Sequence, residues 1–131
     1  MKKSFTLVEI LVVATIIVLL TAATTVTYST FLKQSRDAKR KADLGQISSA
    51  LEMYRSNNDT YPITGLSQLT APTIYIQTVP TDPKNPTYTY YYTATASDYT
   101  LGSYLEGGGT TCVAGQCGGN CSYCLGPYGQ K

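Results

Sequence analysis

The sequence predicts an α+β protein in which a long N-terminal helix, its first half a membrane span, packs on a small antiparallel β-hairpin or sheet. Three observations support this class: no charge occurs between Ile10 and Leu32, apolar residues recur at helical spacing as far as Tyr54, and Tyr–Thr runs typical of strands follow. A Gly- and Cys-rich tail completes the chain. We expect four parts, namely a leader at 1–4, a membrane helix at 5–32, a globular domain at 33–106 and a disulfide-rich tail at 107–131.

The uncharged stretch from Ile10 to Leu32 is long enough to cross a bilayer. As a helix its 23 residues would span about 34 Å, at about 1.5 Å per residue. The hydrocarbon core of a bilayer is about 30 Å thick. The more apolar half comes first, because Thr and Ser residues gather after Leu20.

Residues 33–56 continue the same helix. Five apolar residues at helical spacing form one face, which indicates packing on a core; they are Leu44, Ile47, Ala50, Leu51 and Tyr54. Two oppositely charged pairs have the spacing to meet on its surface, and these are Asp37 with Lys41 and Glu52 with Arg55. We expect the helix to end at Asn57-Asn58-Asp59, just before Tyr61-Pro62.

Residues 87–94 and 99–106 read as two strands joined by residues 95–98, which predicts an antiparallel hairpin. Alternating Tyr88, Tyr90 and Tyr92 share one face, and we expect this face to cover the apolar stripe of the helix, because a hairpin alone is marginally stable. Residues 73–79 are either a short strand or an irregular connection. Core and subunit packing is the interpretation we adopt for these tyrosines, with ligand binding as the alternative.

All four cysteines lie in the tail, at Cys112, Cys117, Cys121 and Cys124. An even number in a Gly-rich segment is typical of disulfides in an oxidising compartment, and the sequence leaves three pairings open. The alternative is a zinc site with four thiolates. Cys121 and Cys124 have the spacing of such a site, whereas Cys112 and Cys117 are further apart than usual. We expect two disulfides, no metal and no cofactor.

Composition argues against an enzyme. The chain has no His, which removes the commonest general base, and no nucleophile–base pair can be found. We therefore expect no catalytic residue. The net charge of +2 equals the charge of Lys2 and Lys3, and the remaining charges balance. This balance does not indicate a nucleic-acid-binding protein.

Glu9 is the unusual residue of the apolar segment. An acidic residue costs up to about 2.5–3.5 kcal/mol at the centre of a membrane helix and less near its end. An ordinary signal anchor has no use for it, and a secretory signal cleaved near residues 21–23 would discard it. The third interpretation is that cleavage between Ser4 and Phe5 creates an α-amino group. Glu9 of a neighbouring copy would pair with this amine, which makes Glu9 an assembly residue.

The string "KKSFTLVEILVV" resembles the prepilin signal of the bacterial type IV pilin and type II secretion pseudopilin family. The resemblance implies that a prepilin peptidase cuts between Ser4 and Phe5 on the cytoplasmic side and N-methylates Phe5. It also implies a filament whose central bundle consists of these helices. Family prepilins usually carry Gly before the cut, where this chain has Ser4.

The resemblance extends over about the first 106 residues. "RDAKRKADLGQISSALEMYRSNNDTYP" and "VPTDPKNPTYTYYYTATASDYTLGSYLE" are similar to small pilins and major pseudopilins, in which a helix is followed by Tyr-Pro, a Pro-x-Asp-Pro string and a hairpin. The string is Pro80-Thr81-Asp82-Pro83 here. Major pseudopilins tend to end in a calcium-binding loop, but this tail has no matching acidic cluster, so we do not expect calcium. Asp82 is expected to mark a turn, with cation binding as the alternative.

Five basic residues follow the apolar segment, namely Lys33, Arg36, Lys39, Arg40 and Lys41. A solvated face, or contacts to acidic residues of adjacent subunits, is the interpretation we adopt. Membrane lipid and nucleic acid are the alternative partners. By the positive-inside rule, these basic residues after the span favour an orientation with the C-terminal domain in the cytoplasm. We expect the opposite orientation, because processing between Ser4 and Phe5 requires the leader to lie in the cytoplasm.

We therefore expect a structural subunit of a type IV pilus or a type II secretion pseudopilus. It would be a single-pass protein of the inner membrane with its C-terminal domain outside the cytoplasm. Its partners would be further copies of itself and related pilins in a helical polymer, the prepilin peptidase and an inner-membrane assembly platform with a cytoplasmic ATPase. The alternative is a membrane-anchored binding module that does not polymerise. The sequence leaves the choice between pilus and pseudopilus open.

Overall fold

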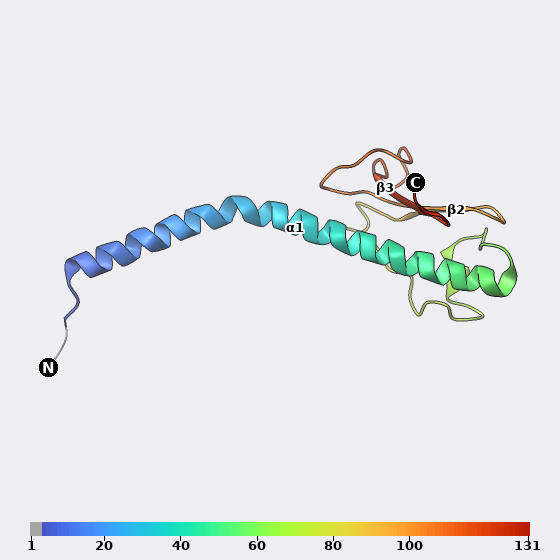
Figure 1. Ribbon diagram of the computed structural model, residues 1–131, viewed down its shortest axis with the longest axis horizontal. Coiled ribbons are helices and arrows are strands. Elements are labelled where there is room, and N and C mark those ends of the chain that lie inside the picture. Colours follow the sequence, from blue (N-terminus) through green and yellow to red (C-terminus); the bar gives the residue numbers. More distant parts are fainter. Residues whose placement is uncertain (1–3) are drawn as a thin grey trace. The chain divides into compact units, whose positions relative to one another are not determined.

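The computed structural model describes residues 4–131, except for the side chains of residues 23–27. The described residues form one long helix, a short 3-10 helix and four strands. The elements are α1 (Leu7–Asn58), η1 (Leu66–Leu69), β1 (Tyr91–Ala94), β2 (Tyr99–Ser103), β3 (Tyr123–Gly126) and β4 (Gly129–Gln130). Figure 1 labels α1 and the strands β2 and β3 among them. The predicted α+β class, with a long helix, an antiparallel sheet and a tail held by disulfides, is confirmed.

Helix α1 is a single helix of 52 residues, as the uninterrupted helical spacing predicts. It ends where expected, because Asp59 adopts a positive φ of 59° and its N–H donates a hydrogen bond to the carbonyl of Arg55 at 2.8 Å. Helices commonly end in this way, with a residue in the left-handed conformation whose N–H bonds to a carbonyl of the last turn. Tyr61 and Pro62 then lead the chain back into the core.

The chain forms two compact units, one up to Gln34 and one from Ser35 to Lys131, with the boundary inside α1. No helix among the described residues is long and apolar enough to cross a membrane. The membrane span expected at residues 5–32 stays a prediction.

The four strands form one antiparallel sheet in the order β1-β2-β3-β4. The predicted hairpin is present, since Ala94 pairs with Tyr99 across residues 95–98. Both strands are shorter than predicted. Residues 83–88 form turns that contain Pro83 and Pro86, and the chain after Ser103 leaves the sheet to bind Asp37 through its backbone. Residues 73–79 are an irregular connection rather than a strand.

The main core lies between α1 and the inner face of the sheet. The predicted helix stripe is confirmed, because Leu44, Ile47 and Leu51 are fully buried. Tyr99 and Leu101 of β2 pack against this stripe from the sheet. Tyr92 of β1 and Tyr90 just before it reach the same core, which confirms the core role expected for these two tyrosines. Tyr88 does not share it, because its ring stacks on Tyr104 with the ring centroids 4.3 Å apart.

A second, smaller core covers the outer face of the sheet. Cys117, Cys121 and Cys124 are fully buried there, together with the half-buried Tyr91 and Tyr104. The tail, for which the sequence predicted disulfides but no strand, supplies β3 and β4 and folds over β2. Gly102 allows this approach, because it lies on β2 opposite Cys124 with no side chain to keep the sulfurs away.

Substituting Gly102 by alanine is expected to lower the free energy of unfolding by about 1–3 kcal/mol through overpacking. The new Cβ would lie 3.0 Å from Sγ and 3.1 Å from Cβ of Cys121. Urea unfolding of the full chain in mild detergent measures the change. Gly45→Ala is the matched control, since a Cβ at that helical position meets no atom within 4 Å. It should raise the free energy of unfolding by about 0.5–1 kcal/mol. Equal effects of the two substitutions would contradict the outer core.

Candidate assembly site and ion-pair cluster

The first unit exposes an apolar helix surface on all sides. Every large apolar residue from Phe5 to Leu20 is exposed, between 47% at Val12 and 81% at Phe5. A helix that is apolar all round is normally buried, either in a membrane or against other helices. An exposed apolar surface of this extent marks a region that associates with lipid or protein.

Glu9 and Thr6 form a reciprocal capping box at the start of α1. The Thr6 N–H and hydroxyl both donate to Oε2 of Glu9 at 2.8 Å, and the Glu9 N–H donates to the Thr6 hydroxyl at 3.3 Å. Such a box satisfies two amide groups that the first helical turn leaves unpaired. Glu9 therefore has a role within its own chain, which our sequence interpretation missed, although Thr-x-x-Glu before an apolar run is its signature.

The Ser4–Phe5 bond lies outside the helix, and both residues are exposed. A bond in this position is accessible to a peptidase without unwinding of α1. The carboxylate of Glu9 is held at the same end of the helix by Thr6. The structure therefore brings the predicted cleavage site and the predicted assembly residue to the same end of α1, five residues apart or fewer.

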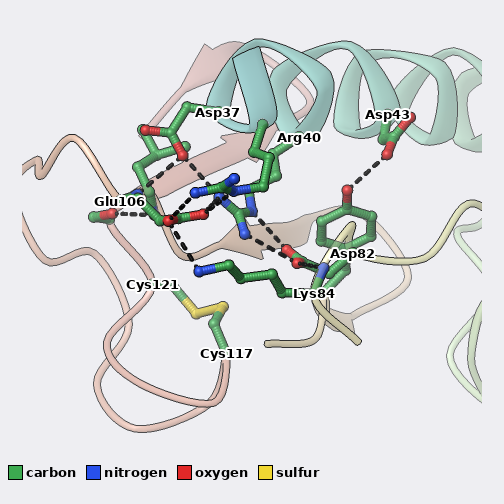
Figure 2. Close-up of polar contacts among 12 residues, drawn as sticks. Asp37, Arg40, Asp43, Asp82, Lys84, Glu106, Cys117 and Cys121 are labelled. Carbon is green, nitrogen blue, oxygen red and sulfur yellow. Dashed lines mark hydrogen bonds and ion pairs between the residues drawn. A yellow bond between two sulfur atoms is a disulfide. The ribbon is translucent and has the colours of Figure 1, made fainter. Parts of the chain in front are cut away.

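The second unit contains a buried ion-pair cluster around Arg40, whose side chain is 0% exposed (Figure 2). Its guanidinium binds both oxygens of Asp82, with Nε to Oδ2 at 2.7 Å and the second contact at 3.0 Å. It also donates to Asp37 at 2.8 Å and to Glu106 at 3.0 Å. Burial alone would lower the pKa of the Arg40 guanidinium, but its bonds to Asp82, Glu106 and Asp37 together raise it. Arg40 therefore stays charged.

Glu106 is the second centre of this cluster. Arg36 binds both of its oxygens at 2.7 Å, and Lys84 binds one at 3.1 Å. The hydrogen bonds from Arg36, with those from Arg40 and Lys84, hold the pKa of the Glu106 carboxyl far below its ordinary value, although burial opposes them. Asp37 accepts the backbone N–H groups of Glu106 and Gly107. The cluster thus ties α1 to the turn at Asp82 and to the chain after β2.

Several surface interpretations from the sequence are wrong because of this cluster. Asp37 pairs with Arg40, not with Lys41, which instead lies over the ring of Tyr123. Arg40 is fully buried, so it does not belong to a solvated face, and Arg36 binds Glu106 of its own chain although its side chain is 26% exposed. The other three basic residues, Lys33, Lys39 and Lys41, are exposed, as the solvated-face interpretation expects. Asp82 does bind a cation, but that cation is the Arg40 side chain.

A second predicted helix pair is also replaced by a tertiary contact. Glu52 and Arg55 meet on the hydroxyl of Tyr61, which donates to Glu52 at 2.9 Å and accepts from Arg55 at 3.0 Å. The Tyr90 hydroxyl likewise donates to Asp43 at 2.7 Å. Burial is the larger cause, and this hydrogen bond the second, of a raised pKa of the Tyr90 phenol. Charged residues of α1 therefore hold the loops and the sheet of the second unit on the part of the helix that belongs to it.

The cluster predicts a dependence of stability on pH. The Glu106 pKa is lowered from its ordinary 4.5, so its contribution is complete above that pH and is lost as the pH falls towards the folded-state pKa. As the pH falls below about 4.5, the free energy of unfolding should therefore fall. Glu106→Gln should reduce that slope by up to about 1.4 kcal/mol per pH unit. An unchanged slope in urea midpoints would contradict the role of Glu106.

The four cysteines form two disulfides, Cys112–Cys124 and Cys117–Cys121. This bears out the expectation of disulfides and selects one of the three pairings. All four sulfurs are bonded in pairs, so the zinc interpretation with four thiolates is wrong. The pairing could not be read from the spacing, because it depends on how the tail folds over Gly102.

A comparison with known protein families finds a match over the part of the chain that contains the ion-pair cluster. A family model described as "Type II secretion system (T2SS), protein G" matches residues 28–114, which is more than half of the chain. The matched range includes the ion-pair cluster and the hairpin, and it ends before Cys117. Comparisons with curated proteins and with solved structures found no match.

Proposed function

We propose that this chain, which belongs to the family of type II secretion system protein G, is the polymerising subunit of a secretion pseudopilus. The family is one of structural, non-enzymatic proteins. Of the two filaments that the sequence left open, the family favours the secretion pseudopilus over the type IV pilus. The observation that carries the proposal is the exposed apolar surface at the start of α1, with Glu9 at its first turn.

The apolar residues up to Leu20 would be buried between helices of neighbouring copies. Each large apolar side chain kept out of water contributes about 1.5–3 kcal/mol. Once the helices have left lipid, burial in a bundle is therefore strongly favoured over exposure to water. Identical copies that contact one another through different faces form an open helical polymer. The globular unit from Ser35 onward would form the outside of this filament.

Glu9 would set the register between copies. After cleavage between Ser4 and Phe5 and N-methylation, each copy would begin with a positively charged amine. A charge of either sign is costly in apolar surroundings, and the two together cost much less. Thr6 keeps the Glu9 carboxylate at the end of the helix, where a neighbouring amine could reach it.

Before assembly the chain would wait in the inner membrane as a single-pass protein, with the unit from Ser35 outside the cytoplasm. This orientation is compatible with the two disulfides, which persist in oxidising compartments. Its partners would be the prepilin peptidase, the inner-membrane assembly platform and related pilins. Membrane lipid would cover residues 5–32 until polymerisation.

Immunogold electron microscopy of cells that produce the chain with its secretion machinery tests this proposal. We expect label at regular intervals along thin filaments. Label confined to the membrane, in cells where other pseudopilins still form filaments, would contradict it and would favour the membrane-anchored binding module.

A further inference from the structure

We propose that the Cys112–Cys124 disulfide is a thiol-exchange site, at which a thiolate from solution attacks Cys112 and releases Cys124. The inference does not depend on the proposed function. The two ends of this disulfide differ in accessibility, because Cys112 is exposed whereas Cys124 is fully buried. Both cysteines of the second disulfide are fully buried as well. Of the four cysteines, Cys112 is the exposed residue, so an external thiol approaches the disulfide from its side.

Thiol–disulfide exchange proceeds by attack of a thiolate on one sulfur, and access decides which sulfur is attacked. The attacking thiolate forms a new S–S bond to Sγ of Cys112. The Cys112–Cys124 bond breaks, and Cys124 leaves as a thiolate with the electron pair. If the donor carries a second thiol, that thiolate attacks the mixed disulfide and releases Cys112. The donor is then oxidised to a disulfide, and the protein disulfide is reduced.

The sheet holds the leaving sulfur in place. Cys124 lies on β3 opposite Gly102 of β2, so its position does not depend on the disulfide. On the other side, the Cys112 N–H donates to the Cys121 carbonyl at 2.9 Å, and the Cys121 N–H donates to the Val113 carbonyl at 2.7 Å. These bonds keep Cys112 near Cys124 after the disulfide opens. The exchange is therefore reversible once the donor is removed.

Opening this disulfide affects an exposed part of the tail. Residues 107–116 are exposed except for the half-buried Val113. The core between α1 and the sheet lies on the opposite face of β2, where it does not contact Cys112 or Cys124. The exchange therefore removes the covalent tie at Cys112, leaves the backbone bonds to Cys121 in place and keeps the globular unit folded. The ligand class is a reduced thiol, either a small molecule or the dithiol of a thiol–disulfide oxidoreductase.

Glutathione under native conditions tests the proposal. The full chain in mild detergent is incubated with reduced glutathione, quenched with acid, alkylated and sequenced by fragment-ion mass spectrometry. We expect glutathione on Cys112 and an alkylated thiol on Cys124, with Cys117–Cys121 intact. The Cys112–Cys124 disulfide should open at least about tenfold faster than the Cys117–Cys121 disulfide. Equal rates, a first adduct on Cys117 or Cys121, or exchange only in denaturant would overturn the proposal.

Two double variants separate accessibility from unfolding. Cys117→Ser with Cys121→Ser keeps the outer disulfide and should form the Cys112 adduct at an unchanged rate. Cys112→Ser with Cys124→Ser keeps the inner disulfide and should form no adduct in the same time. An adduct on the second variant, while its circular dichroism remains native, would overturn the proposal.

A thioredoxin-type dithiol in place of glutathione distinguishes the two thiol sources. Reduction of the outer disulfide without a stable adduct assigns the site to a protein donor as well as to small thiols. Reaction with glutathione alone supports the site and assigns it to small thiols. Reaction with neither donor would contradict the exposure of Cys112 on which the proposal rests.

Discussion

Replacing Arg40 by methionine is expected to lower the free energy of unfolding by about 3–5 kcal/mol, because it leaves buried carboxylates without their counter-ion. Asp82 has a side chain that is 0% exposed, and Arg40 binds both of its oxygens. Methionine fills much of the volume of arginine, so lost charge pairing dominates the effect. Urea unfolding of the full chain in detergent, followed by near-ultraviolet circular dichroism, measures it, since every tyrosine except Tyr28 lies in the unit from Ser35.

Two further variants make this prediction specific. Lys39→Met changes an exposed neighbour and should shift the free energy of unfolding by no more than about 0.5 kcal/mol. Adding Asp82→Asn to Arg40→Met removes the unpaired charge and should restore part of the loss. If Arg40→Met were as stable as the Lys39 variant, the cluster would not hold the turn at Asp82 and the chain after β2 on α1.

Replacing Glu9 by valine is expected to abolish filament formation while the protein remains in the membrane. Valine removes the carboxylate that would pair with the neighbouring amine, but it leaves the apolar surface of α1 unchanged or larger. Electron microscopy and membrane fractionation of the same cells measure the two properties. Normal filaments from the valine variant would refute a role for Glu9 in assembly.

Glu9→Gln distinguishes the two roles that Glu9 can have. Glutamine can still accept the hydrogen bonds of the capping box, but it carries no charge. If assembly needs the ion pair, glutamine should fail as valine does. If filaments form with glutamine but not with valine, then Glu9 acts as a helix cap and assembly does not need its charge. Thr6→Ala removes the cap and keeps the carboxylate, so it should cost about 0.5–2 kcal/mol of local helix stability and allow filaments to form.

The long helix and the hairpin could be predicted because their signals are local. The stripe from Leu44 to Leu51 repeats at helical spacing, and the segment from Tyr88 alternates towards Tyr92 before a short turn. Strand ends were less predictable. Residues 104–106 continue the strand pattern in the sequence, but they leave the sheet because tertiary contacts bind them elsewhere. One such contact is the hydrogen bond from the Glu106 N–H to Asp37.

The ion-pair cluster could not be predicted in full, because its partners are remote in sequence. Arg40 lies 42 residues from Asp82 and 66 from Glu106. One signal was present, since Asp37 and Arg40 continue the helical spacing of the buried stripe that starts at Leu44. Buried positions on a helix rarely hold charges unless these are paired, so that continuation indicates an ion pair without naming the partner.

The tail was the least predictable part. Its Gly-rich sequence lacks the apolar alternation of a strand, and β3 is only four residues long. Its place in the sheet depends on the absence of a side chain at Gly102 and on the cysteines that pack there. The number of disulfides followed from the number of cysteines, whereas the pairing did not.

Intact mass spectrometry of the protein recovered from isolated pseudopili tests the central claim most directly. The account predicts a chain that begins at Phe5, carries one added methyl group on its amine, and has lost the four hydrogens of two disulfides. Filaments whose subunit still begins at Met1 would lack the amine that Glu9 requires, and would contradict assembly through the processed N-terminus.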